Sequence, residues 1–363
     1  MSKRLWLLPW LILLAGCAEL PYYSQSIGGH LEVMGKTRPI EDWLADPATD
    51  ARLRDRLGRV LDLRQFAERR LALPVEDSYA DYADLGRDWV VKNLFAAPEF
   101  SLRAKTWCHP LAGCIAYRGY FDEEMLEEDA ESLRKQGYDV YIAPIAAYST
   151  LGWFDDPVLN TFLGWSEPGL AGLLFHELAH RRVYVEDDSS FNEAYATAVQ
   201  QAGVMAWLTH EGNTEALARY RQRLDNRRQV FELIRAARDD LQAIYSGTRS
   251  QSEKREQKRL RLQRLREDYR RLSAELPGRD GYERWMKSEI NNAKLLSVAT
   301  YHDATPAFHE LLQRNRGDFA AFHRAAEAIG ELPKQQRSDC LASLLEPGPA
   351  RCRGREQATE PGT

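Results

Sequence analysis

The spacing of apolar and polar positions predicts a mostly helical chain with one short stretch of strands. Apolar residues at near-helical intervals, such as Leu57, Val60 and Leu61, indicate helix from residue 27 to about residue 73. A further helix is expected over residues 79–93. Beyond it, Gly and Pro punctuate short β-prone runs, which predicts strands. The two expected strands and the helix between them occupy residues 115–121, 140–146 and 123–136.

The region from residue 215 to residue 276 is charge-dense and carries two series of apolar residues at spacings of three and four, the second including Leu262, Leu265 and Tyr269. This pattern predicts two long helices that fold back on each other around residues 246–248. After them we expect a helix over residues 288–301.

Another helix should then start at Thr305, with Pro306 at its first position. Past Leu345, the content of Pro, Gly and Arg predicts a disordered end.

The first residues combine a charged start with an apolar run from Leu5 to Leu14, which is typical of a signal peptide and too short for a stable membrane span. The run ends in Leu14-Ala15-Gly16-Cys17, the pattern of a bacterial lipobox. Cys17 would then become the lipidated N-terminus, anchored to a membrane by its acyl chains. Ala18 in place of Asp favours the outer membrane over the inner one. The alternative is that Cys17 is a buried structural cysteine behind an unrelated anchor.

Four further cysteines are compatible with disulfides in an exported protein. Close spacing favours Cys108 with Cys114 and Cys340 with Cys352, although four cysteines permit three connectivities. A zinc knuckle around Cys108 and Cys114 is the competing interpretation, but the C-x-x-C spacing is absent.

The chain of 363 residues, 44% of them hydrophobic, is long enough for a sizeable core. Its net charge of −5 argues against a general nucleic-acid binder, and it contains no Gly-rich phosphate loop. One basic segment stands out, because residues 249–271 contain ten Lys or Arg and four Asp or Glu. A solvated helix surface explains this excess, and contact with anionic lipid head groups or an acidic envelope partner is the alternative.

The segment Phe175-His176-Glu177-Leu178-Ala179-His180 carries the H-E-x-x-H pattern. On a helix, residues four apart share a face, so His176 and His180 can hold one zinc ion, with Glu177 beside them as general base. Because the pattern also arises by chance, two partly exposed polar residues are the alternative. A catalytic zinc needs a third protein ligand, and Glu193 is the candidate. Glu193 could instead complete a capping box with Ser190.

The two histidines and the Asn192-Glu193-x-x-Ala196 run resemble the zinc peptidases called gluzincins, in which a Glu on the following helix completes the metal site. Together with segments 117–122 and 147–157, they also resemble the family of predicted bacterial zinc aminopeptidases of lipoprotein type. This second resemblance covers residues 22–308 and implies a zinc site and an aminopeptidase activity.

The expected fold class is α+β and predominantly helical, with a gluzincin-like core, a small mixed sheet and a long helical hairpin insertion. The expected parts are a signal peptide, an N-terminal helical region, the metallopeptidase core, the charged hairpin, a C-terminal helical part of the core and a disordered tail. They occupy residues 1–17, 18–105, 106–210, 211–277, 278–345 and 346–363.

The resemblance also implies roles for residues outside the metal set. Gluzincins stabilise the oxyanion with a Tyr or His from further along the chain, for which Tyr301 and His302 are the candidates. Either could be an ordinary residue at a helix end. Asp187 and Asp188 are the nearest carboxylates that could orient the imidazoles.

Recognition of the substrate is expected just before the metal helix. In gluzincins an edge strand pairs with the peptide, and residues 148–153 could be such a strand or a covered aromatic loop. Asp155 and Asp156 could hold the substrate's free amine, or could be turn residues before Pro157. The Gly-x-Met-Glu-Asn run of the best-known zinc aminopeptidases is absent.

Two functions are therefore compatible with the sequence. The first is a membrane-anchored zinc peptidase of the cell envelope that acts on peptides. The second is an envelope scaffold or adaptor whose metal site is structural or idle. The presence of Glu177 favours the first, because a structural zinc needs no base beside it.

Overall fold

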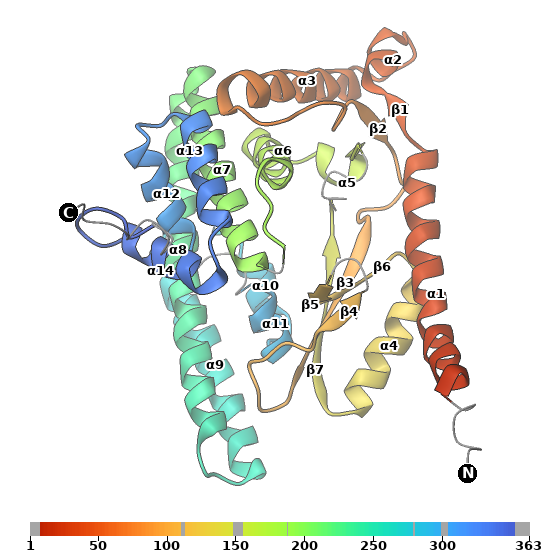
Figure 1. Cartoon of the computed structure of the whole chain (residues 1–363), viewed down its shortest axis with the longest axis vertical. Helices are drawn as coiled ribbons and strands as arrows, with labels where there is room; N and C mark the ends of the chain where they lie inside the picture. The colour runs from red at the N-terminus through yellow and green to blue at the C-terminus, as the bar shows by residue number, and fades with distance from the viewer. Residues whose placement is uncertain are drawn as a thin grey trace, which may run out of the picture.

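The computed structural model describes residues 8–109, 113–147, 155–186, 188–278, 280–298 and 304–352, with side chains from Glu19 onward (Figure 1). The protein is α+β and mostly helical, as the sequence predicts. In Figure 1, helices α6 to α9 and α12 to α14 gather on one side, and the main sheet lies between them and helix α4.

The N-terminal region is broken into several elements, whereas the sequence predicted helix throughout residues 27–73. The break occurs because Pro39 cannot donate a helical hydrogen bond, and because the Asp50 side chain accepts from the amides of Arg52 and Leu53 to start a new helix. No described helix combines the length and the apolar character that crossing a membrane requires. The elements are α1 (Leu8–Gly35), β1 (Arg38–Pro39), α2 (Ile40–Ala45) and α3 (Ala51–Leu71).

The expected helix over residues 79–93 is wrong. Tyr79, Tyr82 and Leu85 are buried at three-residue spacing, which imitates a helical pattern. However, Tyr79 has a φ of 59° and Gly86 a φ of 67°, and neither fits a right-handed helix. Strands occupy this region instead.

In the described part of the chain, two three-stranded sheets and one hairpin form the β structure. The first sheet has the order β1-β2-β8 and the second the order β6-β3-β7, while β4 pairs with β5. The expected strand over 140–146 is confirmed as β7, but the one over 115–121 is split by a turn at Ala116 and Tyr117. The strands are β2 (Asp81–Ala83), β3 (Val91–Pro98), β4 (Trp107–His109), β5 (Gly113–Ile115), β6 (Arg118–Tyr120), β7 (Tyr138–Ile145) and β8 (Val158–Leu159).

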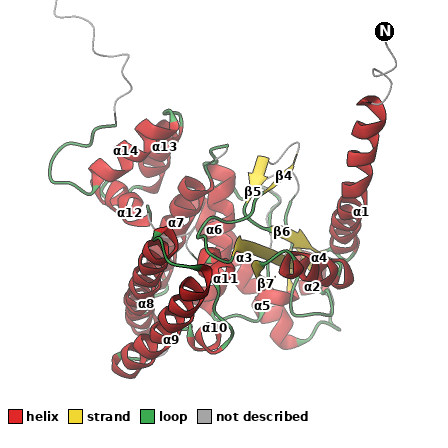
Figure 2. Ribbon diagram, turned by 90° about the horizontal axis from the view of Figure 1, so that it is seen from below, coloured by secondary structure: helices red, strands yellow, loops and turns green. Residues whose placement is uncertain are grey.

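Helix α4 (Glu123–Lys135) confirms the predicted helix and covers one face of the second sheet. Asp122 starts it, because its carboxylate accepts a hydrogen bond from the amide of Met125. Seen from below in Figure 2, α4 and α11 lie on opposite sides of this sheet.

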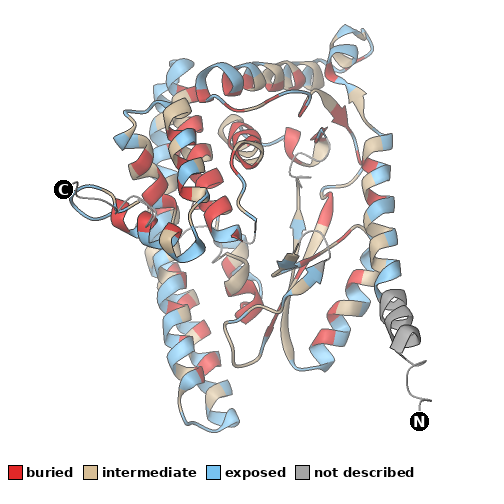
Figure 3. Ribbon diagram, in the orientation of Figure 1, coloured by how far each residue is buried: buried red, intermediate tan, exposed pale blue. Residues whose placement is uncertain are grey.

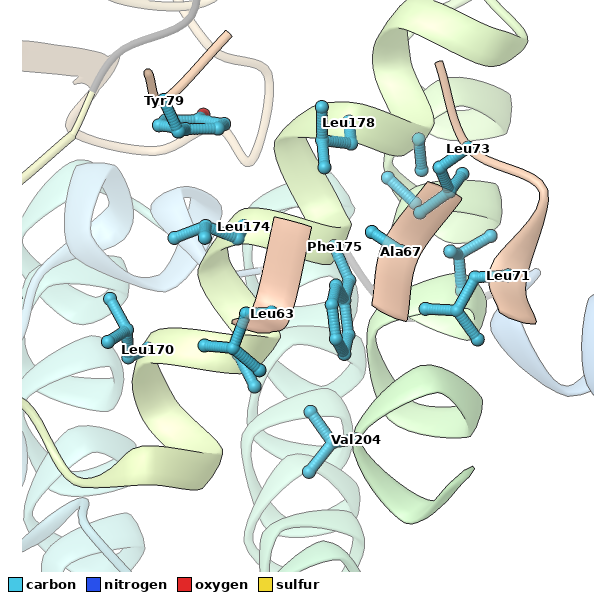
Figure 4. Packing of buried hydrophobic residues seen from close by; sticks show 14 of the residues in the cluster. Leu63, Ala67, Leu71, Leu73, Tyr79, Leu170, Leu174, Phe175, Leu178 and Val204 are labelled. Carbon is cyan, nitrogen blue, oxygen red and sulfur yellow. The ribbon is translucent and has the colours of Figure 1, made fainter. Parts of the chain in front are cut away.

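The main core is built around α6 (Glu167–Arg182) and α7 (Ser189–His210), with the short α5 (Asn160–Leu163) before them. Figure 4 shows Phe175 of α6 between residues of α3 and Val204 of α7. A side chain on Gly203 would come within 2.8 Å of the Phe175 ring and 2.9 Å of Leu71, so the two helices need glycine there to approach. This packing fixes α6 and α7 against each other.

The predicted hairpin is confirmed as α8 (Thr214–Ser246) and α9 (Gln251–Glu275). Its apolar seam packs on α10 (Glu283–Lys287) and α11 (Asn292–Ser297), while Figure 3 shows its outer surface exposed. The helix expected over 288–301 is shorter, because the Asn291 side chain caps α11 through the amide of Lys294. Residues 299–301 lie outside the described part of the chain.

The last helices are α12 (Thr305–Arg314), α13 (Phe319–Gly330) and α14 (Lys334–Leu344), and α12 starts at Thr305 as predicted. Disulfides join Cys108 to Cys114 and Cys340 to Cys352, which confirms the expected pairs and excludes the knuckle. The expected disorder after residue 345 is wrong for residues 346–352, because the second disulfide and a bond from the Arg351 amide to Ser343 hold them.

Candidate metal centre

The connection between α6 and α7 brings their functional residues face to face. Asp188 caps α7 by accepting from the amide of Phe191 at 3.2 Å. The side chain of Asn192 then closes the turn, because it both accepts from the amide of Val185 and donates to its carbonyl, each at 2.8 Å. Glu193 follows directly, so its carboxylate points back toward α6. It makes no capping box with Ser190, since Asp188 is the capping residue.

Three side chains converge between the two helices. The Nε2 atoms of His176 and His180 lie 3.2 Å apart. Glu193 Oε2 lies 3.3 Å from Nε2 of His176, and Oε1 lies 3.7 Å from Nε2 of His180. Within the part of the chain that the structure describes, these three residues form the group that could hold a metal ion, with ligand atoms all within 4.8 Å of one another.

The spacing of these atoms fits a tetrahedral metal. Zinc bonds of about 2.0–2.1 Å place the ligand atoms of a tetrahedron about 3.3–3.4 Å apart, close to the separations of 3.2 and 3.3 Å seen here. Glu193 Oε2 has no hydrogen-bond partner among the described residues although it is buried, because its contact with His176 lacks the necessary alignment. A cation between the three groups would satisfy this oxygen.

The protonation states agree with this interpretation. Burial and the neighbouring His176 lower the pKa of His180 to about 4, so His180 is neutral near pH 7, as a metal ligand must be. Burial opposes the charged form of His176, but its contacts with Glu193 and Glu177 raise its pKa. Burial also opposes ionisation of Glu193, while the two imidazoles lower its pKa overall.

Gln200 orients one imidazole, and the sequence analysis missed it. Its Oε1 lies 3.2 Å from Nδ1 of His176. Because an amide oxygen only accepts, Nδ1 carries the proton and Nε2 keeps its lone pair toward the ligand point. Gln200 stands seven residues after Glu193 on α7, two helical turns along the same face, and this spacing could have identified it.

Asp188 is wrong as a residue that orients an imidazole. Its carboxylate caps α7 and forms an ion pair with Arg337 at 2.9 Å. The sequence put Asp188 close to the histidines along the chain, but the helix cap fixes its carboxylate elsewhere. Asp187 lies outside the described residues.

Glu177 is half-buried on α6, and its carboxylate acts on three side chains of this region. It raises the pKa of His176, and it contributes, after burial, to the raised pKa values of Tyr79 and Tyr117. Both tyrosines come from segments far from α6 in the sequence. Neither was a sequence candidate, because no local pattern links them to the histidines.

Asp155 and Asp156 lie on the same side of the molecule as Glu177, in different environments. The carboxylate of Asp155 is 3.4 Å from Arg181 of α6. Asp156 is buried, and its carbonyl accepts from the amide of Tyr79 at 2.8 Å. Burial, Glu177 and Asp156 together raise the pKa of Tyr79, which links Asp156 to the surroundings of the general-base candidate.

Several predicted residues fall outside the described parts of the chain. They are Tyr301, His302 and the expected edge strand at residues 148–153. The backbone of Cys17 lies in α1, but its side chain is outside the description.

A cavity of about 620 Å³ lies between α7, α8 and α12, lined by Gln201, Phe231 and His309 among others. None of the three converging ligands lines it. Gln201 follows Gln200 by one residue, so it points about 100° away around α7. This cavity therefore does not belong to the metal centre.

Comparison with known proteins identifies one family. The family model described as "Putative aminopeptidase" matches residues 21–341, which is most of the chain. Comparison with curated proteins and with solved structures gave no match.

Proposed function

The chain belongs to the family described as "Putative aminopeptidase", and from this premise we propose that it is a zinc-dependent peptidase of gluzincin type. The observation that carries the proposal is the convergence of His176, His180 and Glu193 at ligand–ligand distances that suit tetrahedral zinc. The chemistry of the donor set, two imidazoles and one carboxylate, is also what a catalytic zinc prefers.

In the proposed mechanism His176, His180 and Glu193 would hold zinc, which would supply Lewis-acid activation of water and of the scissile carbonyl. Glu177, next to His176 on α6, accepts the proton of the attacking water and then delivers it to the leaving amine. Gln200 keeps the His176 ring in the tautomer that directs Nε2 to the ligand point. Tyr301 is proposed to stabilise the oxyanion, with His302 as the alternative.

Cleavage from the free N-terminus is the proposed mode, in line with the family. Asp155 or Asp156 would hold the substrate's ammonium group; Asp155 is exposed and lies 3.4 Å from Arg181, whereas Asp156 is buried beside Tyr79. Endopeptidase activity is the alternative, in which residues 148–153 bind an extended chain. Cleavage of N-acetylated peptides distinguishes the two modes. An aminopeptidase should not cleave them, because acetylation removes the charge that the carboxylate would bind, whereas an endopeptidase should cleave them internally.

We further propose that the protein is an envelope lipoprotein anchored through Cys17, with the outer membrane as the favoured location. Wild-type protein should incorporate labelled palmitate and fractionate with membranes, whereas Cys17→Ser should do neither. Label on the Cys17→Ser protein would refute the anchor.

We propose that the basic segment of the hairpin is a solvated helix surface and not a binding site for lipid or for a protein partner. Its cations pair with acidic residues, as in Arg261 with Asp240 and Arg259 with Glu256. These ion pairs lower the positive field that an anionic lipid or an acidic envelope partner would meet.

The test of the peptidase is a pair of variants with opposite readouts. His180→Ala should lose zinc, because two remaining ligands rarely hold it tightly. Glu177→Gln should keep about one zinc per chain, yet lose several orders of magnitude in peptide hydrolysis, because the amide cannot accept the proton. Metal content by mass spectrometry and a peptide-library assay give the two measurements. Full activity in Glu177→Gln would show that another residue accepts the proton, whereas a zinc-loaded wild type without peptidase activity would favour the scaffold function with an idle or structural metal.

A further inference from the structure

The second sheet has two unlike faces. Leu94, Ala96 and Tyr120 point to one face and pack against Leu126 and the rest of α4. Because side chains alternate along a strand, Phe95 of β3 points to the opposite face. In Figures 1 and 2 this opposite face is turned toward the side of the molecule that holds α7 and α11.

Three aromatic rings lie together on that opposite face. Phe95 is the register partner of Tyr141 in β7, and their ring centroids are 6.2 Å apart. In β6, Arg118 is the register partner of Leu94, and Tyr117 comes one residue before Arg118. Tyr117 therefore lies next to Phe95, across from Tyr141, and the ring centroids of Phe95 and Tyr117 are 5.6 Å apart. Phe95, Tyr117 and Tyr141 are called the aromatic face below.

The aromatic face is partly open, although it belongs to the middle of a sheet. Tyr117 is 37% exposed, and Phe95 and Tyr141 are half-buried. None of the three rings belongs to the hydrophobic clusters of the described residues.

Both ends of the same face are covered. Val91 joins the main core at one end. At the other end, Asp139 accepts from the amide of Asn292 of α11 at 2.8 Å. The exposed rings therefore lie between two packed regions.

The aromatic face adjoins the metal centre. After burial, the charges of Glu193 and Glu177 are the main reasons that the pKa of Tyr117 rises to about 12. The Tyr117 ring lies against Phe95 with an angle of 45° between the ring planes, and Figures 1 and 2 show this face of the sheet turned toward α7, which carries Glu193.

The charged groups beside Tyr141 are already bonded. Lys294 lies 5.4 Å from the Tyr141 ring, but its ammonium donates to the carbonyls of Trp285 and Glu289. Asp139 is paired with Lys258 at 2.6 Å. The chemistry offered to a ligand is accordingly apolar and aromatic rather than ionic.

We propose that the aromatic face binds a large apolar or aromatic side chain of the peptide next to the scissile bond. This inference rests on the proposed peptidase function and adds its substrate class. A ring or a branched aliphatic chain laid on Phe95 and Tyr141 would leave water, while the backbone beside it reaches the ligands on α6 and α7.

The experiment uses the zinc-loaded protein and peptides that are identical except for Phe or Ala beside the scissile bond. We expect kcat/KM to be roughly tenfold to a hundredfold higher for the Phe peptides, the size expected for burying such a side chain. Phe95→Ala and Tyr141→Ala should each reduce this preference, the ratio of the two kcat/KM values, by about tenfold while the zinc content stays the same.

Tyr138→Ala is the matched control, because it removes a ring from β7 on the face that packs against α4. It should leave the preference for Phe intact. Melting temperatures of all variants show whether each one folds, and Phe95→Leu, which keeps apolar bulk, should fall between wild type and Phe95→Ala. Equal rates on Phe and Ala peptides, or a preference that survives in both alanine variants, would overturn the proposal.

Failure of the proposed function gives a different result. If the zinc-loaded wild type cleaves no peptide, the peptidase proposal fails, and the aromatic face is tested by binding of two amino-acid hydroxamates, those of phenylalanine and alanine. Tighter binding of the phenylalanine hydroxamate that Phe95→Ala abolishes supports the aromatic face. Equal binding of the two refutes it.

Discussion

Helices α6 and α7 of the candidate metal centre and the hairpin α8–α9 both contain buried polar side chains, and Lys258 and Asn226 of the hairpin are bonded differently from the three converging side chains. In the hairpin, Lys258 donates to the Asp139 carboxylate at 2.6 Å and to the Glu99 carbonyl at 2.9 Å. Asn226 donates to the carbonyl of Pro277 at 3.0 Å. In the metal centre, Nδ1 of His180 and Oε2 of Glu193 have no hydrogen-bond partner among the described residues.

The difference separates a structural network from a binding site. Burying a polar group is costly unless it is bonded, so a closed network such as that of Lys258 is explained by folding alone. Nε2 atoms 3.2 Å apart with a carboxylate beside them repel or compete for a proton unless a cation lies between them. Buried polar groups that converge without closing therefore point to a ligand.

The largest effect that tests this comparison is expected on stability. Lys258→Met should lower the free energy of unfolding by about 3 kcal/mol. The Asp139 carboxylate, which is largely shielded from solvent, would lose the positive charge with which it pairs. Zinc content should not change, since neither Lys258 nor Asp139 is one of the three candidate ligands. Urea unfolding and metal analysis provide the two measurements.

The neighbouring Arg259→Ala is the control for Lys258→Met. Arg259 is exposed and pairs with Glu256 within α9, so its loss should cost less than about 0.5 kcal/mol. Loss of zinc from Lys258→Met, as expected for His180→Ala, would contradict the distinction between a structural network and a metal site.

The same contrast explains what the sequence could predict. His176, His180 and Glu193 lie on two successive helices, so helical spacing and one short connection were enough to place them together. The α8–α9 hairpin was equally visible, because its apolar seam repeats at intervals of three and four. Both the metal-ligand set and the hairpin were therefore predicted from local helical periodicity.

The errors come from places where tertiary structure overrides such periodicity. Tyr79, Tyr82 and Leu85 repeat every third residue but lie in a segment that pairs as strand and turn. Tyr117 reaches the metal centre only because β6 pairs with β3, a contact that spacing along the chain does not encode. Closeness along the chain likewise did not predict that Asp188 caps α7 and so cannot orient an imidazole.

A smaller effect is expected at Gln200, which belongs to the metal centre without being a ligand. Gln200→Ala should weaken zinc binding or peptide hydrolysis roughly tenfold to a hundredfold, because His176 would lose the acceptor that fixes its tautomer. Competition with a chelator measures the affinity. Gln201→Ala is the matched control, since Gln201 contacts His309 on another side of α7 and should keep wild-type affinity. Identical affinities for the two variants would remove Gln200 from the centre.

The smallest effect concerns a closed network on the same helix as Glu193. His323 of α13 is fully buried, with Nε2 2.7 Å from the carbonyl of Leu71 and Nδ1 2.7 Å from the Tyr195 hydroxyl. A carbonyl only accepts, so Nε2 carries the single proton of a neutral ring and Nδ1 accepts from Tyr195. Burial lowers the pKa of His323 to about 4, against about 6.5 in the unfolded chain.

Since the folded pKa lies below the unfolded one, the unfolded chain binds more protons between these values, and stability must fall as the pH drops from about 6.5 toward 4. The loss attributable to His323 should reach about 1–2 kcal/mol at pH 5. Urea unfolding of wild type and His323→Gln at pH 7 and pH 5 measures it. The difference between the two proteins isolates His323, because His180 and the carboxylates titrate in both. We expect the variant to lose less stability than wild type between the two pH values; equal losses would mean that His323 is not held neutral by the Leu71 and Tyr195 contacts.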